Sequence, residues 1–218
     1  MIVSEPLHIK NSLIEALQKK LPGEDAHRRM LPNGRKLHPE KGLTNMIQSS
    51  VLMLIFPENG ELKTCLIRRP ANMRNHGGQI AFPGGRFEPS DNDLVYTALR
   101  ESFEEIGLKD NLIEVLGLLT PIYIQVSNFT INPIIGWCER LPLLKIDRHE
   151  VDELFIIPFA QLFHPTNFLS KEVTTPRGNF QAPGYFIEPL FIWGATAMIL
   201  SEFKEIYTSI QGLSSGMI

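Results

Sequence analysis

The sequence predicts an α/β fold of the α+β type, in which helices cover a mixed β-sheet. Short apolar and β-branched runs, each bounded by turn residues, outnumber the helical segments. The helical segments are scattered along the chain and do not form one block. A chain of 218 residues with 43% hydrophobic residues can bury one well-formed core.

The N-terminal part is predicted to be one amphipathic helix followed by an irregular connection. Apolar residues recur every three or four positions from about residue 8 to 20, and Pro22-Gly23 ends the pattern. Residues 24–41 are polar and interrupted by proline and glycine, which favours irregular structure. Residues 1–45 are therefore interpreted as an extension that precedes the main domain, residues 46–212.

The main domain contains most of the predicted elements. Strands are predicted at residues 51–56, 64–68, 112–119, 122–126, 131–137, 153–157, 173–175 and 180–187. Helices are predicted at residues 97–106 and 194–210, with a helical turn at 159–163. Asn59-Gly60 favours a tight hairpin between the first two strands. Gly107 is expected to end the first helix, because glycine readily adopts the left-handed conformation found there.

Composition excludes several classes of partner. The net charge is −3 and no Lys/Arg run occurs, so no nucleic-acid partner is expected. No apolar stretch approaches the roughly 20 residues of a membrane span, and the N-terminus lacks the pattern of a signal peptide. Cys65 and Cys138 show no metal-binding spacing, which is typical of buried thiols in a reducing compartment. A cytoplasmic protein without a membrane partner is the expectation.

Three carboxylates share one face of the predicted helix at 97–106. At about 100° per residue, Glu101, Glu104 and Glu105 fall within an arc of roughly 100°. The apolar residues Val95, Leu99, Phe103 and Ile106 are expected on the opposite side. Because neighbouring like charges repel, the cluster favours a compensating cation, and hard oxygen ligands suit Mg²⁺ or Mn²⁺. A solvated acidic helix face is the alternative interpretation.

A glycine pair lies upstream of the acidic helix. Gly84-Gly85 follows Phe82-Pro83 and supplies backbone that can approach a ligand closely, with carbonyl groups available to a metal. A Pro-Gly-Gly turn is weak evidence alone. Followed by an Arg-Glu pair, two further glutamates and a glycine, it becomes a specific pattern.

This pattern resembles the Nudix box, G-x₅-E-x₇-R-E-U-x-E-E-x-G-U, where U is bulky and apolar. The matching residues are Gly85, Arg100, Glu101, Glu104, Glu105, Gly107 and Leu108. The spacing is one residue longer than standard, Asp91 or Asn92 replaces the early glutamate, and Ser102 replaces a larger apolar residue. The resemblance implies a Nudix-type α/β/α sandwich with a mixed sheet. It also implies that the Gly84 carbonyl, Glu101, Glu104 and Glu105 hold the metal.

A second resemblance covers the residues before the box. Residues 69–85 are similar to the motif R-[SA]-x₃-R-x₃-G-x₃-F-P-G-G of coenzyme A pyrophosphatases in the Nudix family, with Pro70 as the mismatch. It implies cleavage of coenzyme A or acyl-coenzyme A to adenosine 3′,5′-bisphosphate and 4′-phosphopantetheine or its acyl form. The substrate-binding residues would be Arg69, Arg74, His76 and Gly78.

Several alternatives stay open from the sequence. The general base is either a glutamate of the box or a later one, Glu150 or Glu153. The substrate could instead be another nucleoside diphosphate derivative, such as ADP-ribose or a dinucleotide. A non-catalytic ligand-binding module on the same fold is a third reading. The partner is a small molecule in every case, and a homodimer is compatible with the sequence.

Overall fold

The longest strand of the fold is apolar on both sides. In the computed structural model, which describes residues 5–39, 45–73, 76–175 and 178–215, strand β1 spans Ile47–Glu58. Leu52 and Leu54 point into one hydrophobic cluster, whereas Met53 and Ile55 point into another. A strand buried on both faces belongs at the centre of a sheet covered on both sides. β1 therefore forms the middle of the sandwich.

The main sheet is mixed, as predicted. Its path runs β3-β2-β1-β7-β5, with β4 on β1, β6 on β7 and β8 on β2. Its other strands are β2 (Glu61–Arg68), β3 (Ile80–Ala81), β4 (Gly84–Arg86), β5 (Glu114–Leu118), β6 (Ile122–Ile124), β7 (Phe129–Trp137) and β8 (Glu153–Pro158). β1 and β7 are parallel, and the other pairs are antiparallel.

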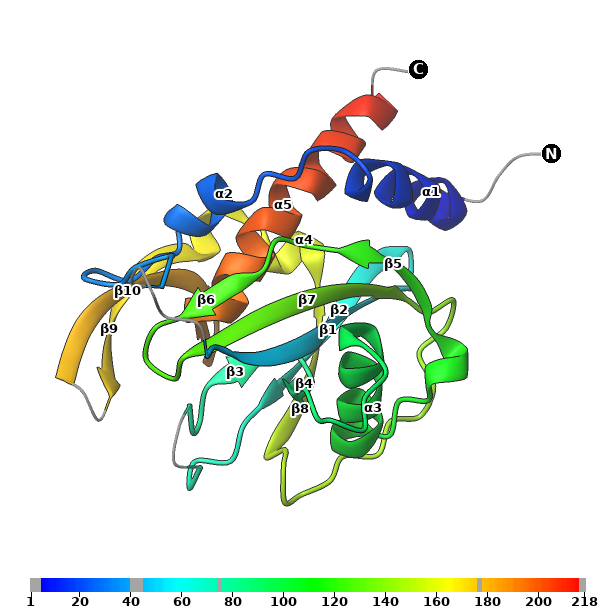
Figure 1. Cartoon of the computed structure of the whole chain (residues 1–218). Coiled ribbons are helices and arrows are strands. Elements are labelled where there is room, and N and C mark those ends of the chain that lie inside the picture. Colours follow the sequence, from blue (N-terminus) through cyan, green and yellow to red (C-terminus); the bar gives the residue numbers. More distant parts are fainter. Residues whose placement is uncertain (1–4, 40–44, 74–75, 176–177, 216–218) are drawn as a thin grey trace.

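Helices cover both faces of this sheet (Figure 1). Helix α3 (Leu94–Ile106) packs on one face against β1 and β4. The other face is covered by α1 (Glu5–Leu17), α4 (Phe159–Leu162) and α5 (Gly194–Ser215). The predicted α/β/α sandwich is thus confirmed.

The N-terminal extension contains a helix that the sequence pattern did not reveal. The five-residue α2 (Glu24–Arg28) lies in the stretch predicted to be irregular, and it packs on α5. The cause is a distant residue, Glu202 of α5, whose buried carboxylate accepts hydrogen bonds from Gly23 N (3.1 Å) and Thr120 Oγ1 (2.6 Å) and contacts His27 Nε2 (3.0 Å). A helix of five residues is too short to show a helical period in its sequence. Its contact with Glu202 cannot be predicted from the local sequence either.

The extension shares the core of the main domain. Leu13 and Met30 belong to the same hydrophobic cluster as β1 and α5, and both are buried. The boundary near residue 45 stays a prediction, because the described residues on its two sides pack into one core.

Strands of two to four residues are too short to be predicted from pattern. β3 and β4 lie in the stretch between residues 70 and 93 that lacked a predicted element, and β11 (Leu190–Trp193) was also missed. β11 completes a second, three-stranded sheet with β9 (Phe168–Thr175) and β10 (Gly178–Ile187). Each of the three forms only by pairing with another strand.

The buried face of α3 differs from the predicted one. Phe103 was expected in the core but is 54% exposed, which corrects that assignment. Ile106 is buried as predicted, but the small residues Ala98 and Ser102 are buried where Phe103 was expected. Ser102 Oγ donates to the Ala98 carbonyl (2.6 Å). Small side chains let the helix approach β1 closely, so the helix is rotated toward them and Phe103 turns outward. Glu105 lies on this buried face.

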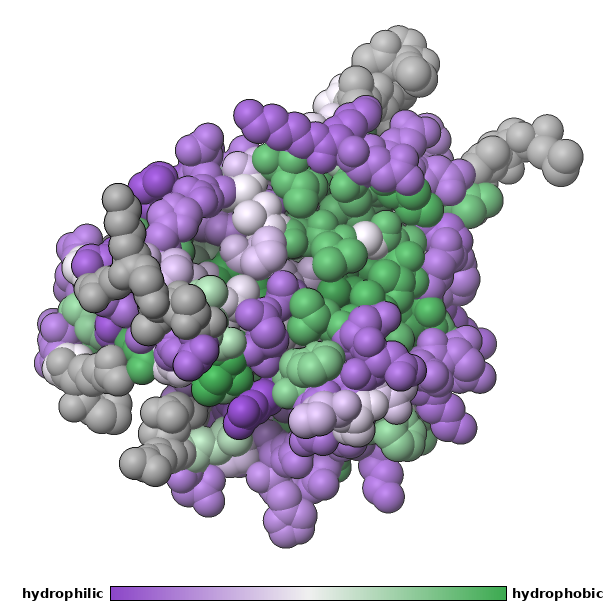
Figure 2. All heavy atoms as spheres, viewed as in Figure 1, coloured by the Kyte–Doolittle hydropathy of each residue, from purple (hydrophilic) through white to green (hydrophobic). Residues whose placement is uncertain are grey.

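One face of the molecule carries an extended apolar area. Figure 2 shows apolar side chains gathered beneath α1 on the face of the molecule that also presents α3. Leu118 of the edge strand β5 (47% exposed) and Leu7 of α1 (41%) are among the exposed large hydrophobic residues. Within the described ranges, no helix is both long enough and apolar enough to cross a bilayer.

Candidate active site

The glycine pair is held against the central strand. β4 pairs with β1 at Ser50 and Val51, and Leu52 N donates to the Pro83 carbonyl (2.8 Å). Gly84 has φ of 150°, and a Cβ there would overlap the carbonyl oxygen of Ser50. A side chain on Gly84 would therefore push β4 away from the sheet.

Gly85 is needed for a different reason. A Cβ on this residue would overlap the carboxyl group of Glu101, which lies directly against the Gly85 backbone. The glycine pair thus brings the main chain of β4 into contact with the acidic side of α3. The two elements form one site.

The position of α3 is fixed at both ends. Asp93 caps its N-terminus by accepting a hydrogen bond from Tyr96 N (2.7 Å), and Gly107 ends it with φ of 70°, as predicted. Below the helix, Asp91 Oδ1 and Oδ2 accept from Arg100 Nε (2.8 Å) and Nη2 (3.0 Å). Such a bidentate pair fixes the guanidinium in one orientation.

Asp91 occupies the position of the early glutamate in the Nudix-box pattern. Its side chain is fully buried and also accepts hydrogen bonds from Thr97 Oγ1 (2.9 Å) and Glu88 N (3.0 Å). The guanidinium of Arg100 holds the pKa of Asp91 well below its usual range. Of the two alternatives left by the sequence, Asp91 therefore makes these contacts, which link the loop before the helix to the helix itself.

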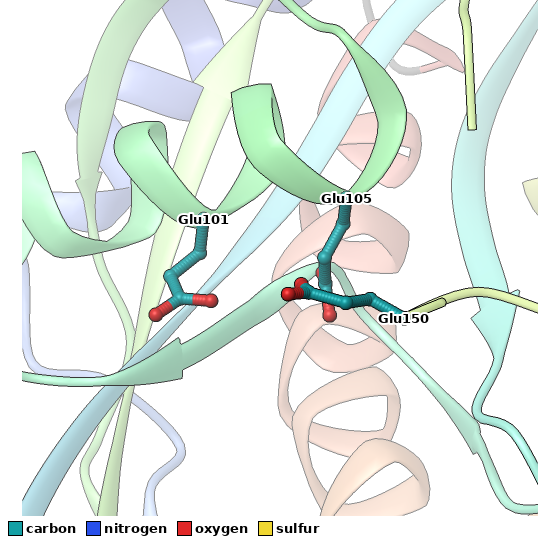
Figure 3. A group of neighbouring side chains, drawn as sticks. All are labelled: Glu101, Glu105 and Glu150. Carbon is teal, nitrogen blue, oxygen red and sulfur yellow. The ribbon is translucent and has the colours of Figure 1, made fainter. Parts of the chain in front are cut away.

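Three carboxylates meet beside the glycine turn. Glu101, Glu105 and Glu150 each bring a carboxylate oxygen within 4.8 Å of the others. Figure 3 shows that Glu101 and Glu105 extend from α3 while Glu150 reaches them from a separate loop. Glu105 is 3% exposed, and its Oε2 accepts a hydrogen bond from Gly84 N (2.8 Å). The sequence placed all three glutamates among the catalytic candidates, and the structure brings them together.

Glu104 lies outside this group. Its carboxylate accepts a hydrogen bond from Arg100 Nη1 (3.0 Å), and its side chain is 47% exposed. The same nitrogen donates to Glu101 Oε1 (2.9 Å). Arg100 therefore offsets the repulsion along the helix and draws Glu104 toward itself.

The loop that carries Glu150 is tied down on both sides. Asp147 N donates to the Glu105 carbonyl and Asp152 N donates to the Arg68 carbonyl, both at 2.9 Å. Between them, Val151 is fully buried and anchors the turn. Glu153, the other late candidate, pairs with Arg68 (3.4 Å) and is not in the carboxylate group. Geometry thus favours Glu150 over Glu153.

The electrostatics of the group favour a bound cation. Burial raises the pKa of Glu105 to about 8, and the charges of Glu101 and Glu150 add to this. Burial also raises the pKa of Glu101. The charge of Arg69 acts in the opposite direction on the pKa of Glu105. A divalent cation would stabilise the ionised forms, and an all-oxygen set of this kind fits Mg²⁺ or Mn²⁺.

Three of the predicted substrate-binding residues, Arg69, His76 and Gly78, lie on a described part of the loop that follows β2. Gly78 N donates to the Arg69 carbonyl and Arg69 N donates to the Gln79 carbonyl, both at 3.0 Å, which closes the loop. Gly78 and His76 have φ of 72° and 60°, and His76 Nδ1 contacts Gln79 Oε1 (3.1 Å). Arg74 lies outside the described residues.

The Arg69 side chain has an unusual environment. Its Nε is buried and has no hydrogen-bond partner in the described part of the chain. Its charge is nonetheless close enough to affect the pKa of Glu105. The Arg69 guanidinium, with a buried N–H donor and a position near the carboxylate group, is suited to bind an anionic substrate.

The sandwich fold, the glycine turn and the clustered carboxylates are typical of hydrolases that act on phosphate compounds with a divalent metal. A family model described as "NUDIX domain" matches residues 46–178. The chain therefore belongs to the Nudix family, and it is a pyrophosphohydrolase of nucleoside diphosphate derivatives.

Individual relatives agree with this assignment. The chain is 33% identical to the Nudix hydrolase NudL of Pectobacterium atrosepticum, over 63% of this chain and 71% of the relative. It is 36% identical to NudL of Yersinia pestis, over 64% and 70%. Among solved structures, the Nudix hydrolase RenU of M. smegmatis matches with a TM-score of 0.55 and 17% identity, over 82% of this chain and 97% of RenU. The last similarity concerns the fold alone.

Gly85→Ala is expected to weaken metal binding at least about tenfold while the protein stays folded. This is the scale of the loss when a group that orients the ligands of a metal site is displaced. The new methyl group would meet only the end of a flexible side chain, Glu101, which can swing out of the site. Calorimetric titration with Mn²⁺, together with thermal unfolding, measures both effects. Gly212→Ala, whose methyl group would contact nothing within 4 Å, is the control. Unchanged Mn²⁺ affinity in Gly85→Ala would contradict the contact with Glu101.

Proposed function

We propose that the protein hydrolyses the pyrophosphate bond of coenzyme A or acyl-coenzyme A in the presence of Mg²⁺ or Mn²⁺. The products are adenosine 3′,5′-bisphosphate and 4′-phosphopantetheine or its acyl form. The observation that carries the proposal is the buried Nε of Arg69, which has no hydrogen-bond partner among the described residues and whose charge acts on Glu105. Arg69 opens the motif at residues 69–85 that is similar to coenzyme A pyrophosphatases, so the spare donor belongs to the residue that the motif assigns to substrate.

The carboxylates have distinct roles in the proposal. Glu101, Glu105 and Glu150 would hold the metal with the carbonyl of Gly84, and Glu104, paired with Arg100, would add negative charge nearby. When bound, the metal neutralises charge on the phosphoryl oxygens and makes a bound water more acidic. Glu150 is exposed and comes from a loop, which favours it as the group that takes the proton of the attacking water.

The remaining residues orient the substrate. The guanidinium of Arg69 pairs with a pyrophosphate oxygen and adds positive charge where negative charge accumulates. Arg74, His76 and Gly78 bind further parts of the substrate in this proposal. The positive φ angles of His76 and Gly78 reverse the direction of the chain. Gly78 N can therefore donate to the carbonyl of Arg69, where the loop begins.

Two other functions compete with this one. A Nudix hydrolase for ADP-ribose or a dinucleotide would use the same carboxylates, so only the substrate distinguishes it. A non-catalytic binding module is disfavoured by the buried carboxylate of Glu105, because repelling acids are costly without a cation.

The proposal extends to the location and assembly of the protein. Cys65 and Cys138 are buried free thiols, which supports a cytoplasmic setting. The edge strand β5 with its exposed Leu118 offers a surface for a homodimer, which stays a prediction. The small-molecule substrate is the partner that the site requires, with no nucleic acid or membrane.

In a direct comparison, kcat/KM for coenzyme A is expected to exceed that for ADP-ribose by about tenfold or more. A site that hydrogen-bonds a polar group of its substrate discriminates against substrates that lack this group. Arg69→Lys is expected to lower kcat/KM for coenzyme A roughly tenfold, since lysine cannot make two parallel hydrogen bonds. Arg28→Lys, on the exposed surface of α2, is the matched control. A preference for ADP-ribose would refute the coenzyme A assignment.

A further inference from the structure

A pocket outside the carboxylate group lies where two loops meet. It has a volume of about 370 Å³, within the range of ligand pockets. Its walls are formed by Pro70, Ala71, Asn72, Arg148, His149 and Asp152. Pro70, Ala71 and Asn72 belong to the motif at residues 69–85, but none of the six has a role in the proposed chemistry.

The pocket adjoins the carboxylate site through both of its walls. On one side, Pro70 directly follows Arg69, whose charge acts on Glu105. On the other side, His149 directly precedes Glu150, a member of the carboxylate group. The hydrogen bond from Asp152 N to the Arg68 carbonyl (2.9 Å) ties the two walls together. The pocket and the carboxylate group therefore share the same two loops.

The side chains of the pocket suit a phosphorylated sugar. Arg148 Nη1 donates to the Asp152 carbonyl (2.6 Å), which orients a guanidinium that has five N–H donors in all. His149 N donates to Asp147 Oδ1 (2.8 Å), which fixes the backbone from which the imidazole projects. Guanidinium, imidazole and the Asn72 amide are donors for phosphate oxygens. The carboxylate of Asp152 is an acceptor for a sugar hydroxyl.

We infer that this pocket binds a phosphate monoester on the ribose of the substrate, with Arg148 and His149 as its ligands and Asp152 accepting from the neighbouring hydroxyl. The inference rests on the proposed function, because the 3′-phosphate of coenzyme A is such a group. It divides the phosphate binding between two places. Arg69 faces the pyrophosphate at the carboxylates, and Arg148 and His149 face the 3′-phosphate.

The test compares substrates with and without the 3′-phosphate. We measure kcat/KM for coenzyme A and dephospho-coenzyme A in the parent, in Arg148→Gln and in His149→Gln, with Arg28→Gln as the control on a distant helix. The parent prefers coenzyme A, and the ratio of the two kcat/KM values falls at least about tenfold in Arg148→Gln, the loss expected for a charge-assisted hydrogen bond. A ratio unchanged in both variants overturns the inference.

A binding measurement separates this inference from the proposed function. Adenosine 3′,5′-bisphosphate and adenosine 5′-monophosphate are titrated calorimetrically into the same four proteins. Tighter binding of the bisphosphate that is lost in Arg148→Gln supports the pocket, even if coenzyme A is not cleaved and the proposed substrate is wrong. Equal affinity for both nucleotides in the parent overturns the inference, even if coenzyme A is cleaved.

Discussion

Glu105→Gln is expected to reduce turnover by at least about a hundredfold, comparable to the loss of a group that stabilises charge in the transition state. Glu105 is the most buried member of the carboxylate group, and it joins α3 to the glycine turn through Gly84 N. Glutamine retains an oxygen that can accept this bond but loses the negative charge that holds a cation. Steady-state rates with saturating coenzyme A and Mg²⁺ measure the effect.

The fold of this variant should survive. Burial raises the pKa of Glu105 to about 8, so without metal the folded protein carries the cost of keeping this buried acid protonated near neutral pH. Glutamine avoids that cost, so Glu105→Gln should unfold no more easily than the parent when metal is absent. Glu15→Gln, an exposed change on α1, serves as the control for activity. Turnover of Glu105→Gln within a few-fold of the parent would mean that α3 is not the catalytic helix.

Asp91→Asn is expected to lower the free energy of unfolding by about 3 kcal/mol, the scale for breaking a buried ion pair by removing one partner. The Asp91 side chain is fully buried and that of Arg100 is 15% exposed, so the guanidinium would lose a bidentate partner that solvent cannot fully replace. Activity should fall as well, because Arg100 also positions Glu101. Urea unfolding at pH 7 measures the stability.

The pH dependence has a definite sign. The pKa of Asp91 is lowered in the folded state, so its contribution to stability is present above the unfolded pKa of about 3.9 and is lost as the pH falls below it. The difference in stability between parent and Asp91→Asn should therefore shrink between about pH 5 and pH 3. Asp25→Asn, an exposed change on α2, should show no such difference. If the difference in stability between the parent and Asp91→Asn stays constant with pH, the charge of Asp91 does not cause that difference.

Local patterns predicted local structure. α3 and its glycine end, the hairpin between β1 and β2, and α5 follow from periodicity and turn residues within a few positions of each element. β4 and α2 do not, because both depend on partners far along the chain: β1 for β4 and Glu202 for α2. Phe103 shows a related limit. An apolar residue on a helix does not reveal which side of the helix meets the sheet.

The same limit applies to the site. Glu101 and Glu105 could be paired from the sequence because they lie four residues apart on one helix. Glu150 could only be named as one of two late candidates, since its place depends on the bonds of Asp147 and Asp152 to distant carbonyls. The separation of Glu104 from the carboxylate group also depends on contacts that only the folded structure shows. It reflects how Arg100, held by Asp91, shares its Nη1 between two carboxylates.

Direct titration with Mn²⁺ tests the metal site on which the whole account depends. The parent should bind Mn²⁺, Glu105→Gln and Glu150→Gln should bind it at least about tenfold more weakly, and Glu15→Gln should match the parent. Glu104→Gln should fall between these limits, because its carboxylate is already paired with Arg100. A parent that binds no Mn²⁺ at millimolar concentration, or a Glu105→Gln protein that binds it as tightly as the parent, would contradict the assignment of Glu101, Glu105 and Glu150 as the metal site.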